Sequence, residues 1–178
     1  WGIHWLDQVL WWTDELAPKT IYSTGDRNIA GDAVYTAKHQ TSDAPDHQLA
    51  VYDFEDFSMT WEHRKFGSNE TDRGENVGCY FYGTEGIFHQ GWRGGWTFYP
   101  SKKSQKPIHQ GATLHEPDSQ NIRELWADFL ASIENKKRLP VCDIEIGHRS
   151  TNMSLLGMIS MKLGRSITLN LVKQLLSP

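Results

Sequence analysis

The first residues of the chain carry apolar side chains at helical spacing. They recur every three or four positions, which predicts a helix over residues 3–13: Ile3, Leu6, Val9 and Leu10. The tryptophans of the same stretch fall on other sides of this helix. A helix that is apolar almost all round is typical of one that is buried in a core or at a large interface.

The middle of the chain alternates between apolar and polar positions in short runs, which is typical of half-buried strands. In the clearest run, Met59, Trp61 and His63 fall on one face and polar residues on the other. The loop expected to follow the strands is long and lacks a period, over residues 101–118. The runs predict strands over residues 20–24, 34–38, 48–54, 58–64, 77–82, 87–90 and 96–99.

Two further helices are expected at the end of the chain, over residues 119–136 and 143–163, with Gly164 as a natural helix end. A helix, a block of strands and two more helices predict the α+β class. We expect a predominantly antiparallel open sheet with the helices packed on one face. The length suits one domain over residues 1–168, with residues 169–178 as a tail.

Composition narrows the classes of partner. The chain has 178 residues and a net charge of −4 without a basic stripe, so neither nucleic acid nor an anionic membrane is expected to bind. No apolar run is long enough to cross a bilayer. The only two cysteines, Cys79 and Cys142, form neither a metal-ligand spacing nor a disulfide framework. We therefore expect no metal and a reduced, cytoplasmic setting.

His4 and Asp7 are the first candidates for chemistry. They lie three positions apart, so they share a helix face. Imidazole ordinarily titrates near neutral pH, which suits proton transfer. Two interpretations are open: a satisfied polar pair within a core, or part of a site.

Gly2, His4 and Asp7 form a Gly-x-His-x-x-Asp pattern at a helix start. Strand-like residues 51–54 and 61–62, the turn Gly83-Thr84-Glu85-Gly86 and the run 155–165 follow in order. Together they resemble the Gfo/Idh/MocA family of glucose–fructose oxidoreductase and inositol 2-dehydrogenase, over residues 2–168. The resemblance implies the substrate-side domain of an NAD(P)-dependent sugar or polyol dehydrogenase. It also implies that His4 handles a substrate hydroxyl proton, and that Asp7 either orients His4 or is simply a partnered helix residue.

Other residues are candidates for binding the substrate. His148 and Arg149 open the last helix, where polar groups can reach a ligand or simply face water. Trp61 and Trp92 are able to stack on a sugar ring, although packing is the more frequent role of an aromatic residue in a strand. Arg93 is able to bind a carboxylate or phosphate, or to remain solvated.

The chain also departs from the family pattern. The family's Asp that precedes the glycine would fall before Trp1, and the usual Trp-Asp-Pro-like ending is replaced by Leu169-Asn170-Leu171. The N-terminal Rossmann domain and the segment with the catalytic Lys have no counterpart, and no Gly-x-Gly-x-x-Gly occurs. We expect this chain to bind no cofactor alone, and the full-length protein to bind NAD or NADP.

Two alternatives stay open at this point. The chain is also interpretable as a free-standing, non-catalytic module for dimerisation or ligand binding, or as part of an NAD-dependent glycosidase. In each case we expect a homo-oligomer that associates through the sheet face, because large aromatics occupy alternating strand positions.

Overall fold

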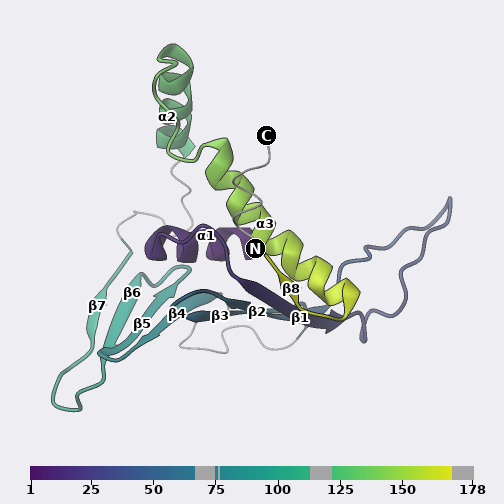
Figure 1. Ribbon diagram of the computed structural model, residues 1–178, viewed down its shortest axis with the longest axis horizontal. Coiled ribbons are helices and arrows are strands. Elements are labelled where there is room, and N and C mark those ends of the chain that lie inside the picture. The colour runs from purple at the N-terminus through teal and green to yellow at the C-terminus, as the bar shows by residue number, and fades with distance from the viewer. Residues whose placement is uncertain (67–74, 76, 113–121, 170–178) are drawn as a thin grey trace. The chain divides into compact units, whose positions relative to one another are not determined.

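The computed structural model describes residues 1–66, 75, 77–112 and 122–169 (Figure 1). Its contacts divide the chain into two compact units. The first unit is Trp1–Gly67 with Cys142–Pro178, and the second unit is Ser68–Val141. The prediction of one domain over residues 1–168 stays a prediction.

The first unit contains a four-stranded antiparallel sheet with two helices on one face (Figure 1). The strand order is β3-β2-β1-β8. The elements are α1 (Gly2–Thr13), β1 (Thr20–Asp26), β2 (His47–Asp53), β3 (Ser58–Arg64), α3 (Ile144–Leu163) and β8 (Ile167–Thr168).

The core of the first unit lies between this sheet and its helices. Period-two alternation places Ile21, Ala50 and Tyr52 on the helix side of the strands. Leu6 and Leu10 of α1 and Met153 of α3 complete the buried cluster. Met59 and Trp61 of β3 pack against this cluster, which confirms the face predicted for them.

Small residues let α3 approach the sheet closely. Its buried stripe is Ser150, Met153, Gly157 and Ser160. A Cβ added at Gly157 would lie 2.6 Å from Tyr52 Oη, which itself donates to the Met153 carbonyl at 3.0 Å. The Ser23 backbone N–H of β1 donates to Ser160 Oγ at 3.0 Å. Helix and sheet are therefore joined by hydrogen bonds as well as by apolar packing.

The second unit contains a separate antiparallel sheet of order β4-β5-β6-β7. Its strands have directly opposed partners such as Tyr80 and His89, whose rings stack at 4.4 Å between centroids. Tight reversal at Gly83 and Gly86 connects the first two strands. The elements are β4 (Gly78–Gly83), β5 (Gly86–Gly91), β6 (Trp96–Pro100), β7 (Ile108–Gln110) and α2 (Ile122–Glu134).

The structure confirms the α+β class and the antiparallel strand arrangement. The described strands form two sheets of four instead of one. Predicted positions agree for most elements, although residues 119–121 of the expected helix 119–136 and residues 170–178 of the tail lie outside the described residues. No helix in the described ranges is long and apolar enough to cross a membrane.

Two local predictions were wrong. Residues 34–38 form no strand, and this segment has only an isolated bridge between Tyr35 and Gln40. Turn hydrogen bonds, including Thr36 N–H to the His39 carbonyl at 2.8 Å, occupy its backbone groups. The expected loop 101–118 contains strand β7, whose three residues are all exposed and so lack the alternation of a half-buried strand. Residues 113–118 of that loop lie outside the described residues.

Candidate functional site

His4 and Asp7 lie in the first half of α1 but have different surroundings. His4 is exposed, and its ring lies edge-on to the Trp1 ring with 5.8 Å between centroids. Asp7 is half-buried and accepts a hydrogen bond from Ser150 Oγ of α3. Ser150 is buried, and its Oγ also lies 3.0 Å from the Ile146 carbonyl oxygen. Asp7 thus joins the two helices, whereas His4 faces solvent.

The carboxylate of Asp7 also acts on a neighbouring thiol. Partial burial raises the pKa of Cys142, and the negative charges of Asp7 and Asp143 raise it further. In the second unit, burial raises the pKa of Cys79 to about 11. Both thiols therefore stay protonated at neutral pH, and neither is a nucleophile there.

Gly2 permits close packing at the start of α1. A Cβ added there would lie 3.3 Å from Ser154 Oγ and 3.7 Å from the Trp61 ring. Trp61 is half-buried, and its ring lies beside the first turn of α1, which also carries His4. Ser154 Oγ is buried at the same junction and has no hydrogen-bond partner among the described residues. Sequence reasoning noted Ser150 only as part of the polar start of the last helix and did not single out Ser154, because their contacts are with residues distant in the chain.

His148 and Arg149 lie near the N-terminus of α3. The helix is capped by Asp143, which accepts from the Ile146 N–H at 2.9 Å. His148 Nε2 lies 2.6 Å from Asn152 Nδ2, and Arg149 Nε donates to Glu145 Oε1 at 2.9 Å. The Arg149 ion pair is partly exposed and contributes little to stability, so an acidic ligand could compete for this guanidinium.

Trp92 and Arg93 belong to the second unit, in the turn between β5 and β6. Three successive backbone N–H groups of this turn donate to the Glu75 carboxylate. The shortest distances are 3.1 Å from Trp92, 3.3 Å from Arg93 and 2.7 Å from Gly94. This turn is the glycine-rich part of the described chain, and its N–H groups are directed at an internal carboxylate. It does not fit the phosphates of a dinucleotide.

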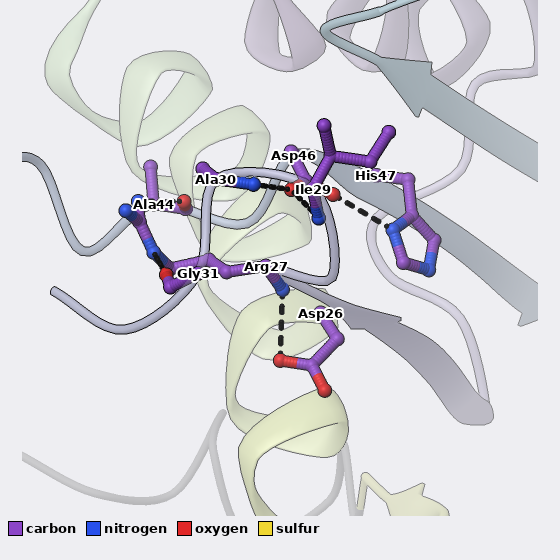
Figure 2. Close-up of polar contacts among 8 residues, drawn as sticks. All are labelled: Asp26, Arg27, Ile29, Ala30, Gly31, Ala44, Asp46 and His47. Atoms are coloured by element: carbon purple, nitrogen blue, oxygen red, sulfur yellow. Dashed lines mark hydrogen bonds and ion pairs between the residues drawn. The ribbon is translucent and has the colours of Figure 1, made fainter.

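Asp46 is the most strongly perturbed carboxylate among the described residues, and sequence reasoning missed it. Its carboxylate accepts from the backbone N–H groups of Ile29 and Ala30 at 2.8 and 2.9 Å, and from His47 Nδ1 at 3.0 Å (Figure 2). These hydrogen bonds lower the pKa of Asp46 to about 2. The bond from the Ala30 N–H has the largest effect on this pKa, and the bond from His47 has the next largest.

Arg27 closes the same loop from the other end. Its side chain donates to the carbonyls of Gly31 at 2.8 Å and Ala44 at 3.0 Å, and also to that of Ser42. Asp46 and Arg27 satisfy backbone groups of residues 29–44 that no neighbouring strand pairs. The pKa shift of Asp46 is therefore explained by loop structure, without a catalytic role.

Solved structures of other proteins have a fold similar to that of this chain. No protein-family model matches the sequence, and no curated protein matches it significantly. Among solved structures, aldose-aldose oxidoreductase from Caulobacter crescentus is similar with a TM-score of 0.66 and 11% identity, over 94% of this chain and 46% of that one. An NAD-binding protein from Listeria innocua matches with a TM-score of 0.59 and 15% identity, over 95% and 50%.

A super-repressor mutant of Gal80p from Saccharomyces cerevisiae matches in the same way. Its TM-score is 0.61 at 13% identity, over 93% of this chain and 47% of that one. The chain thus spans about half the length of each of these structures. The fold implied by the sequence resemblance is confirmed: the chain has the fold of the C-terminal domain of Gfo/Idh/MocA oxidoreductases.

Proposed function

We propose that this chain is the substrate-side half of an NAD(P)-dependent oxidoreductase of the Gfo/Idh/MocA family that acts on a sugar or polyol. One observation carries the proposal: His4 is exposed in the first turn of a helix that Asp7 fixes to α3, within a fold shared with an aldose oxidoreductase. An exposed imidazole on a rigidly packed helix is positioned to exchange a proton with a substrate hydroxyl.

The chain's residues divide into roles under this proposal. His4 takes or returns the hydroxyl proton, and Asp7 holds the helix that carries His4 against α3 through its hydrogen bond with Ser150. His148, Arg149 and Trp61 lie in the same unit as His4 and are assigned to substrate binding. Trp92 and Arg93 are also proposed to bind the substrate. Their backbone N–H groups donate to the Glu75 carboxylate. NAD or NADP would bind the nucleotide-binding half of the complete protein.

The match to Gal80p supports a second candidate function. The matched form of that protein is named a super-repressor mutant and has a fold similar to that of this chain, so the fold also occurs in proteins named for something other than oxidation. The second candidate is a non-catalytic module for ligand binding or dimerisation.

Turnover separates the two candidates. The complete protein, offered a panel of aldoses and polyols, is expected to reduce NAD or NADP with at least one of them. Absorbance of the reduced nicotinamide measures the rate, and omission of the sugar is the control. If every member of the panel fails with both cofactors while the protein still binds a sugar, the non-catalytic module is the correct function.

We also propose a homo-oligomer formed through sheet faces, most simply a two-fold dimer. In the second unit, Phe88 and Trp96 stack at 5.4 Å on one face while Tyr82 is 76% exposed on the other. Large aromatics on both faces favour burial against another copy over an interface of more than ~1,000 Å². Light scattering at micromolar concentration is expected to give twice the mass of one chain, and a monomer mass would contradict this proposal.

A further inference from the structure

Helix α2 has one apolar face that is uncovered among the described residues. Its large apolar side chains recur at i, i+3, i+4, i+7, i+8 and i+11, and each is between 47% and 57% exposed. No α2 side chain in the described range is buried. This α2 face consists of Ile122, Leu125, Trp126, Phe129, Leu130 and Ile133.

A short helix with such an apolar face is stable only when that face is buried against other protein atoms. Helix α2 has 13 residues, and an isolated helix shorter than about 12–15 residues is only marginally stable in water. Helices in proteins are stabilised mainly by packing of the apolar face. The α2 sequence is therefore suited to a helix whose face is buried in the functional protein.

Polar contacts hold the C-terminal end of α2 but leave the α2 face free. Arg138 donates to the Asp128 carbonyl at 2.7 Å and to Ser132 Oγ at 2.8 Å. The Asp128 carboxylate accepts from the Val141 N–H at 2.7 Å and pairs with Arg138. Asp128 and Ser132 border the α2 face, and Phe129 and Ile133 beside them stay 47% and 57% exposed. The helix and the segment after it thus form a fixed edge from which the apolar side chains project.

We propose that the α2 face docks onto the nucleotide-binding half of the complete protein. This inference rests on the proposed function. The similar structures support it: this chain matches them over 93–95% of its own length but only 46–50% of theirs. Each of those chains therefore contains a further part, about as long as this chain, that has no counterpart here. A domain in the same chain is present at a high effective concentration, so a small contact is sufficient to hold it.

The small surface area of the α2 face argues against a second copy of this chain as its binding partner. A helix of 13 residues presents a face about 20 Å long and about 10 Å wide. That footprint is on the order of 200 Å² for each copy, whereas a stable interface between separate proteins buries about 800 Å² for each partner. The α2 face is too small to hold two separate chains together by itself.

Hydrogen exchange of the α2 backbone amides tests the proposal. In the complete protein these amides are expected to exchange at least about 10-fold more slowly than in the chain alone, because docking supplies the packing that the helix lacks. Equal rates in both would overturn the proposal. Protection in the chain alone that rises with concentration would overturn it in favour of a second copy. Protection of the α2 amides in the chain alone at every concentration would overturn it too, because the α2 face would then be buried by another part of the same chain.

Matched variants locate the contact. Phe129→Glu places a charge in the α2 face, whereas Ala127→Glu places the same charge on an exposed position away from it. In the complete protein, Phe129→Glu is expected to abolish the protection of α2 and Ala127→Glu to retain it. Equal effects of the two would contradict docking by this face. The chain alone should keep its melting temperature with Phe129→Glu, which separates lost docking from lost folding.

These outcomes are distinct from those of the proposed function. Protected α2 amides in a complete protein that reduces neither NAD nor NADP would leave the docking intact and remove the enzymatic role. Turnover with unprotected α2 amides would do the reverse.

Discussion

Replacement of His4 by alanine is expected to lower turnover of the complete protein by about 100-fold or more. Loss of a general acid or base commonly costs 10²–10⁴-fold in rate. The change removes an imidazole that is exposed at the start of α1, so little packing is lost. Steady-state kinetics of the wild-type and variant proteins measure the effect, which should fall mainly on kcat because the proton moves during the chemical step.

Stability should hardly change in the same variant. Surface substitutions usually alter the free energy of unfolding by less than about 0.5 kcal/mol, which corresponds to a shift of about 3 °C or less in melting temperature. His39→Ala is the matched control, because His39 is also exposed and its hydrogen bonds to Thr36 use backbone atoms. A large loss of melting temperature with unchanged turnover would show that His4 is a structural histidine.

Asp7 has a contact with another helix that could not be identified from the sequence. Its carboxylate bonds Ser150, a residue 143 positions away in the sequence. A single sequence shows that His4 and Asp7 share a helix face, but it does not show which residue on another helix meets them. The sequence alone therefore leaves both alternatives for Asp7 equally open, and the contact with Ser150 favours the partnered helix residue.

Alternation predicted the strands well where one face is buried. In β3, Met59 and Trp61 point to the helices while Thr60 and Glu62 face away, and the strand bounds matched. The same signal failed for β7, which is exposed throughout. It also gave a false strand near Tyr35, where turn hydrogen bonds replace a ladder.

The buried face of α3 could not be identified from apolar periodicity. Ser150, Gly157 and Ser160 are buried, whereas Leu155 and Ile159 are partly exposed. Small residues allow close approach to the sheet, and their hydroxyls bond groups on α1 and β1. Such contacts are set by tertiary packing, for which local periodicity carries no signal.

Cofactor binding should be absent from this chain and present in the complete protein. The described glycine-rich turn directs its N–H groups at Glu75 and so offers no cradle for a pyrophosphate. A dinucleotide site would instead require a loop between a strand and a helix N-terminus. The proposal assigns that loop to the nucleotide-binding half.

Paired calorimetric titrations of NAD and of NADP, into the chain alone and into the complete protein, test most directly that this chain is the substrate-side half of a dinucleotide enzyme. We predict saturable heat with at least one cofactor in the complete protein and none in the chain alone. Tight, saturable binding by the chain alone, or no binding of either cofactor by the complete protein, would contradict this account.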